Sequence, residues 1–105
     1  MRITKFAAGV TLCLLSAWAG WGQGDAKDLF LDKCSVCHGP DGTGKTAKGK
    51  KLKVKDVHQT VATESEADMT KIVTEGKGTD MDAFGKDLNA AQIKGLVAYY
   101  RSLAK

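Results

Sequence analysis

The chain has 105 residues, 43% of them hydrophobic, with 16 Lys and Arg against 12 Asp and Glu and a formal net charge of +4. This length leaves room for one domain and one hydrophobic core, since domains usually hold about 100–200 residues. The small excess of basic residues is weak support for nucleic-acid binding, for which a concentrated basic surface is typical.

The first 19 residues have the pattern of a secretory signal peptide. Arg2 and Lys5 give a positive start, residues 6–15 are apolar, and residues 16–19 are mostly small with an A-x-A arrangement. We expect cleavage after Ala19, export to the periplasm or beyond, and one mature domain at residues 20–105 without a membrane span. An uncleaved anchor stays an alternative, although the apolar run is shorter than the roughly 20 residues that cross a membrane.

Cleavage would make the mature chain small and nearly neutral. It removes two of the 16 basic residues and none of the 12 acidic ones, so the net charge falls from +4 to +2. An exported chain of this charge is not expected to bind nucleic acid. Small domains bury a lower fraction of their surface and often need an additional stabilising element. A large apolar cofactor bonded to the chain would supply one.

Along the mature chain, the first predicted helix starts at Asp25, which sits where an N-cap would lie. Its helical register continues to Cys37, and Gly39 and Pro40 then end it. Residues 41–63 are rich in Gly, Lys and Thr without a sustained period, so we expect a loop with at most a short turn. No strand of useful length is predicted, and the fold class is all-α.

Capping signals followed by apolar stripes predict two further helices. Thr63 and Glu66 have the spacing of a capping box, and this helix ends at Gly76. Asn89 and Gln92 mark the start of the last helix, and an ordered loop around Met81 lies between the two. The apolar stripes consist of Met69, Ile72 and Val73 in the second helix and Ile93, Leu96, Val97, Tyr100 and Leu103 in the third.

A CxxCH sequence, formed by Cys34, Cys37 and His38, carries the chemistry. On one helical turn the two cysteines project from the same side, so both thiols can form thioethers with the vinyl groups of one haem. His38 can then bind the iron as a neutral imidazole, with its other ring nitrogen held by an acceptor that the sequence does not identify. We therefore predict one covalently attached haem c, which agrees with export.

Other interpretations of the same residues are open. A thioredoxin-like CxxC needs a βαβ setting, and no strands are predicted here. A zinc centre would use Cys34, Cys37, His38 and His58, but the adjacent Cys37 and His38 fit poorly into one tetrahedral site. A chance CxxCH in a structural helix would leave two exposed thiols in an oxidising compartment.

The second axial position of the iron decides between types of chemistry. Met and His ligation raises the reduction potential and favours electron transfer, whereas a replaceable ligand permits gas or peroxide chemistry. Met81 is the preferred candidate because its Gly-flanked loop lies far enough along the chain to approach the opposite haem face. Met69 on an apolar stripe suits the core instead, and His58 in a Lys-rich loop suits solvent.

These residues together resemble a small class I cytochrome c of the bacterial type. The resemblance rests on CSVCHGPDGTG at residues 34–44, the loop from Gly78 through Met81 to Phe84, and LVAYYRSL at residues 96–103. It implies a cytochrome c fold, with three main helices and long loops wrapped around one covalently bound haem. It also implies that the N-terminal helix crosses the C-terminal one, which brings together Phe30, Leu96 and Tyr99.

The family's Met loop usually reads M-P-x-F, and Asp82 stands where the proline is expected. The leading hypothesis is a periplasmic electron carrier, rather than a catalyst, that shuttles single electrons between redox partner proteins as a monomer or in transient complexes. Asp82 motivates an alternative, a peroxidase-like enzyme or small-molecule sensor with a labile sixth ligand. A haem-free interaction module is the third hypothesis.

Six lysines form a basic ribbon after the motif. Two interpretations are open: the ribbon steers an acidic redox partner toward the haem edge, or it is a solvated loop. The ribbon consists of Lys45, Lys48, Lys50, Lys51, Lys53 and Lys55.

Overall fold

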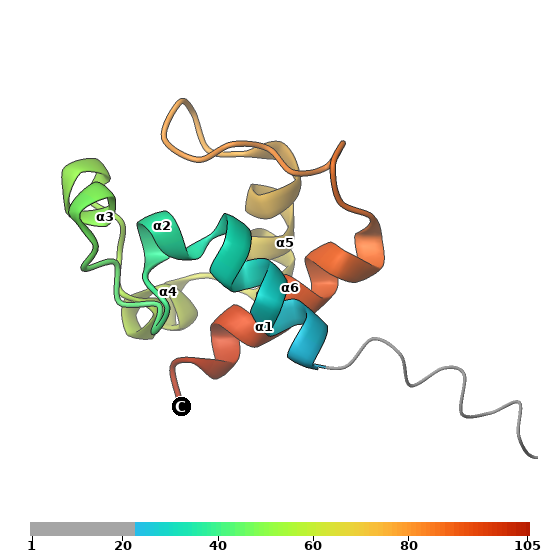
Figure 1. The fold of residues 1–105 in the computed structure, drawn as a ribbon, viewed down its shortest axis with the longest axis horizontal. Coiled ribbons are helices and arrows are strands. Elements are labelled where there is room, and N and C mark those ends of the chain that lie inside the picture. The colour runs from blue at the N-terminus through green and yellow to red at the C-terminus, as the bar shows by residue number, and fades with distance from the viewer. Residues whose placement is uncertain (1–22) are drawn as a thin grey trace, which may run out of the picture.

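A computed structural model of the protein describes residues 23–105, where six helices are joined by loops (Figure 1). The predicted all-α class is confirmed; the one β-type pairing in this range is an isolated bridge between Lys77 and Met81. The expected signal peptide lies outside the described residues, and no helix within them is long and apolar enough to cross a membrane. The helices are α1 (Gln23–Lys33), α2 (Ser35–His38), α3 (Ala47–Leu52), α4 (Val57–Thr63), α5 (Glu66–Glu75) and α6 (Ala90–Ser102).

The core forms where α1 crosses α6, as Figure 1 shows near the centre of the molecule. Phe30 of α1 is only 2% exposed and packs in one cluster with Leu88, Ile93 and Leu96. Its ring also lies 5.3 Å from that of Tyr99, measured between centroids. The expected crossing of the first and last helices is confirmed, and α5 packs against α6 as well.

Helix α6 begins as the sequence predicts. The Asn89 side chain accepts a hydrogen bond from the Gln92 N–H at 2.8 Å, and the Gln92 side chain accepts one from the Asn89 N–H at 2.9 Å. This reciprocal capping satisfies two N–H groups that a helix start otherwise leaves without partners. The apolar stripe behind it is in register, with Ile93, Leu96 and Val97 buried.

The predicted start of α5 was wrong by two residues. Ser65 is the N-cap, and its capping box is closed by Asp68 rather than by Glu66. Thr63 does not cap α5 because it is the last residue of α4, where its hydroxyl donates to the Gln59 carbonyl at 3.2 Å. Two S/T-x-x-D/E patterns overlap here, one from Thr63 to Glu66 and one from Ser65 to Asp68. Because Thr63 still belongs to α4, the second pattern caps α5.

The predicted loop at residues 41–63 was also wrong, because it contains both α3 and α4. Each of these short helices has a side-chain cap. The Thr46 hydroxyl accepts from the Gly49 N–H at 2.9 Å, and the Asp56 carboxylate accepts from the His58 N–H at 2.9 Å. Helices of six and seven residues are too short to show a sustained apolar period, which is why the sequence pattern missed them.

Gly49 allows α3 to lie directly against the end of α2. A Cβ atom at this position would overlap the carbonyl oxygen of Cys37 and lie 2.5 Å from that of Gly44. Both neighbours are backbone atoms, which cannot rotate away as a flexible side chain would. The close approach of these two helices therefore requires glycine.

We predict that Gly49→Ala lowers the free energy of unfolding by about 1–3 kcal/mol, because the added methyl group overpacks this contact. Gly95→Ala is the matched control, since a Cβ there would lie 3.6 Å from Ala26, at ordinary contact distance within α6. The control should be neutral or stabilising because alanine favours a helix. Chemical denaturation of both purified variants measures the difference, and an equal loss in both would contradict the prediction.

Candidate functional site

The CxxCH residues lie at the junction of α1 and α2. The predicted single helix from Asp25 to Cys37 was wrong, since α1 begins at Gln23 and helical geometry is interrupted at Cys34. The Cys34 carbonyl accepts from both the Cys37 N–H at 3.2 Å and the His38 N–H at 3.0 Å. This tightened turn keeps Cys34, Cys37 and His38 together on one helical path, with both cysteines as half-buried free thiols.

Burial keeps the Cys34 thiol in its neutral form. Desolvation is the main cause that raises its pKa to about 11, with Lys33 opposing the shift and Cys37 adding to it. The side chain packs against the core cluster of Phe30, Leu88, Ile93 and Leu96. One of the two motif cysteines is thus part of the hydrophobic core.

The His38 ring packs against two aromatic side chains that also contact each other. Its centroid is 5.1 Å from that of Tyr100, in an edge-on arrangement at 66°, and 6.4 Å from that of Phe30. Burial lowers the pKa of His38 below its ordinary value because it penalises the charged form. The ring is therefore neutral near pH 7, which is the form that binds a metal.

The Nδ1 atom of His38 is buried and has no hydrogen-bond partner among the described residues. The sequence predicts an acceptor for one ring nitrogen, and the described part of the chain supplies none at Nδ1. A buried polar atom without a partner costs about 1–3 kcal/mol, so such atoms are rare and often belong to functional sites. This buried Nδ1 atom without a partner distinguishes His38 from an ordinary core histidine.

Met81 lies on the loop between α5 and α6, which arches across the top of the view in Figure 1. The loop closes on itself through hydrogen bonds of the Lys77 N–H to the Met81 carbonyl at 2.9 Å and of the Met81 N–H to the Lys77 carbonyl at 3.3 Å. Gly76 has a φ of +82° and lies so close that a Cβ would be 2.8 Å from the Met81 carbonyl oxygen. Backbone contacts therefore hold the half-buried Met81 in place.

The same loop is attached to the core that holds Cys34. The Phe84 N–H donates to the Val73 carbonyl at 2.9 Å, and Phe84 packs against the core cluster. Met81 itself forms no hydrogen bond with α2 in the described part of the chain. The structure thus brings Cys34, Cys37 and His38 together and places Met81 on a separate, anchored segment.

The two other ligand candidates have different surroundings. Met69 is 4% exposed in α5, where its sulfur lies 3.6 Å from Arg101 Nη1, so its predicted place in the core is confirmed. His58 is exposed, and its Nδ1 lies 2.7 Å from the Asp56 carboxylate. No three His, Cys, Asp or Glu side chains within residues 23–105 gather as a metal cluster, so the zinc alternative has no geometric support.

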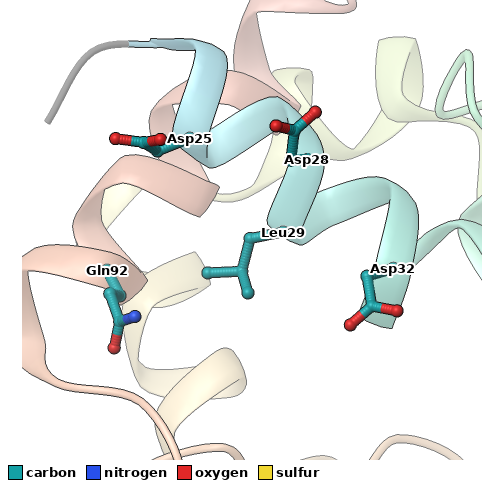
Figure 2. Close-up of a pocket in the computed structure, with 5 residues that line it drawn as sticks. All are labelled: Asp25, Asp28, Leu29, Asp32 and Gln92. Carbon is teal, nitrogen blue, oxygen red and sulfur yellow. The ribbon is translucent and has the colours of Figure 1, made fainter.

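A shallow hollow lies between α1 and α6 (Figure 2). Leu29 occupies its centre, with Asp25, Asp28 and Asp32 along α1 and Gln92 on α6. It has a volume of about 480 Å³ and opens widely to solvent. None of Cys34, Cys37, His38 or Met81 lines it, so the hollow is separate from the candidate site.

A family model described as "Cytochrome C oxidase, cbb3-type, subunit III" matches residues 23–99. The chain belongs to this cytochrome c family. A solved structure, the "KustC0563 c-type cytochrome", is 29% identical to this cytochrome, with a TM-score of 0.71 over 77% of this chain and 99% of that chain. No curated protein matches the chain.

These findings confirm the resemblance to c-type cytochromes and the cytochrome c fold. Proteins of this class carry covalently bound haem c and act generally in electron transfer. The cytochrome positions its CxxCH turn through Thr46, whose hydroxyl donates to the Val36 carbonyl at 2.7 Å while it accepts from Gly49. One hydroxyl group therefore both caps α3 and attaches it to α2.

We predict that Thr46→Val lowers the free energy of unfolding of the cytochrome by about 1–2 kcal/mol, because both hydrogen bonds are lost. Thr46→Ser is the matched control, since it keeps the hydroxyl group and should stay close to the original stability. Chemical denaturation measures both variants. Equal stability of Thr46→Val and Thr46→Ser would show that the hydroxyl does not hold the two helices together.

Proposed function

We propose that this cytochrome is an exported carrier of single electrons between redox partner proteins, rather than a catalyst. One haem c is bound through Cys34 and Cys37, and His38 and Met81 are the iron ligands. The observation that carries the proposal is the single turn that presents two free thiols and one neutral, half-buried imidazole. The signal pattern of residues 1–19 supports export to the periplasm, with residues 20–105 as the mature domain.

The residues present fit a haem. The two thiols are one helical turn apart, as two thioether bonds to one planar group require. Among residues 23–105 the buried Nδ1 of His38 has no hydrogen-bond partner, which suits a side chain that binds a group outside the polypeptide. Two aromatic side chains pack against the imidazole and would shield that side of it from water.

When bound, the haem supplies an iron that accepts and releases one electron. The protein's own task is to hold two fixed ligands in a dry setting, so that little rearrangement accompanies the change of charge. The core cluster around Phe30 provides that setting on the His38 side. On the other side, two backbone hydrogen bonds between Lys77 and Met81 restrain Met81 without the proline that the family usually has.

Asp82 affects this arrangement less than its sequence position suggests. Its side chain is exposed, so its carboxylate can stay hydrated beside the half-buried Met81. The two backbone hydrogen bonds between Lys77 and Met81 restrain the loop in place of a proline. Gly76 permits the close approach of this backbone, because a Cβ there would overlap Met81 and Ala83. These contacts support Met81 as the sixth ligand.

We predict that Met81→Ala abolishes the long-wavelength sulfur-to-iron band of the ferric protein and lowers its reduction potential, because the thioether ligand is lost. Met69→Leu is the control, since Met69 lies in the core of α5 and its replacement should leave the band unchanged. Absorbance spectra in both oxidation states give the result. Retention of the band in Met81→Ala would exclude Met81 as the ligand.

The second candidate function is a small-molecule sensor or peroxidase-like enzyme with a labile sixth ligand. It is favoured by one observation, namely that the Met81 loop shares no hydrogen bond with α2 within residues 23–105. Rapid binding of carbon monoxide to the ferrous protein would support this function, and slow binding would support the carrier. Mass measurement of the mature protein tests the covalent haem on which both depend.

The lysine ribbon indicates the surface charge of the proposed partner. All six side chains are exposed, residues 42–55 contain no acidic residue, and no lysine of the ribbon lies within 4.0 Å of a described carboxylate. The ribbon runs along α3, which Thr46 attaches to the CxxCH turn. Val36 on that turn is 57% exposed. An acidic docking surface on the partner would complement this face.

We predict that Lys48→Glu/Lys51→Glu slows electron transfer to ferricyanide roughly tenfold at low ionic strength, because a local positive potential attracts this anion. Lys71→Glu/Lys94→Glu is the matched control, with the same change of net charge on exposed positions of α5 and α6. Stopped-flow rates of the two double variants should converge at high salt. Equal slowing by both pairs would mean that net charge, and not the ribbon, controls the encounter.

A further inference from the structure

Tyr100 is in direct contact with the proposed iron ligand. Its ring meets the His38 imidazole edge-on, at 66° and 5.1 Å between centroids. The sequence predicts only that Tyr100 belongs to the apolar stripe of α6. Its proximity to His38 results from the crossing of α1 and α6. Phe30, whose ring lies 6.1 Å from that of Tyr100, is also 6.4 Å from the imidazole.

The Tyr100 ring is held at its far end as well. Its hydroxyl group donates to Thr60 Oγ1 at 3.4 Å, and the Thr60 hydroxyl donates in turn to the Asp56 carbonyl at 3.2 Å in the first turn of α4. Phe30 stacks on the Tyr100 ring at 6.1 Å and 30°. Contacts from α1 and α4 thus restrain a ring that itself belongs to α6.

The neighbouring Tyr99 makes a different set of contacts. It packs against Phe30 at 5.3 Å, as Tyr100 does at 6.1 Å. Within the described residues, however, its ring makes no aromatic contact with His38 and its hydroxyl group has no hydrogen bond. Two adjacent tyrosines on one helix therefore share the core, and one of them contacts the imidazole.

We propose that Tyr100 is a positioning residue that fixes the plane of the His38 imidazole, with Thr60 as the anchor of its hydroxyl group. The inference rests on the proposed function in one respect, that His38 binds the iron. The side chains around an axial histidine determine how its ring is oriented, and this orientation affects the electronic state of the metal. The protein achieves this through an aromatic edge rather than a hydrogen bond to Nδ1.

The test uses the haem-bearing protein and the variants Tyr100→Leu, Tyr100→Phe and Thr60→Val, with Tyr99→Leu as the control. Mass measurement and the sulfur-to-iron band first verify that haem attachment and methionine ligation are retained. Proton NMR of the ferric protein then reports the imidazole plane through the hyperfine shifts of the haem methyl groups. Potentiometry gives the equilibrium constant for reduction.

We expect Tyr100→Leu to change the order or spread of the methyl shifts and to alter the equilibrium constant at least threefold. Tyr100→Phe and Thr60→Val, which remove only the hydroxyl contact, should produce the same smaller change, and their combination should add nothing further. Tyr99→Leu should keep the original methyl pattern. Loss of stability alone would not reproduce this difference between adjacent tyrosines.

Original methyl patterns in the haem-bearing Tyr100 variants would overturn the inference and leave the proposed function intact. A methyl pattern changed equally by Tyr99→Leu would also overturn it, because the effect would then come from core packing in general. If Tyr100→Leu does not fold, Tyr100→Phe and Thr60→Val decide the question. Protein that matures without covalent haem would overturn the proposed function and this inference with it.

Discussion

The burial of Phe30 between α1 and α6 is the interaction on which the rest of this cytochrome depends. Its side chain is 2% exposed in the core cluster, and its carbonyl accepts the Cys34 N–H at 2.8 Å. Packing of one residue therefore determines where the CxxCH turn begins. The same ring contacts His38 and Tyr100, so the hydrophobic core and the proposed metal site share an element. A change in core packing would reach the iron ligand directly, because interiors are close-packed and transmit strain.

The segment after the motif is held by backbone geometry rather than by apolar burial. The Gly44 N–H donates to the His38 carbonyl at 2.7 Å, and Gly49 allows α3 to approach Cys37. Because glycines and one threonine hydroxyl make these contacts, the side chains of the segment are free to be charged. This explains how six exposed lysines can adjoin the proposed haem site without loss of the fold. The acidic side chains of α1 lie on a different surface, around the hollow of Figure 2.

Capping residues in the sequence predicted where the helices next to them begin or end. Asn89 with Gln92 located α6 correctly because a capping box acts within one helical turn, and Gly76 located the end of α5 for the same reason. The signals failed where two of them overlapped, at Thr63 and Ser65, and where helices were too short for an apolar period, as in α3 and α4. The break at Cys34 was also missed, since nothing in local propensity separates this residue from the helix on either side.

The sequence by itself determined the spacing of Cys34, Cys37 and His38, the all-α class and the family resemblance, because these depend on covalent order and on period. Tertiary structure alone decided that Tyr100 faces His38, that Phe84 ties the Met81 loop to the core of Cys34, and that Gly76 permits a close approach to the loop in which Asp82 replaces proline. The physical reason is the same in each case. These contacts join segments far apart along the chain, and only the packing of α1 across α6 brings them within reach.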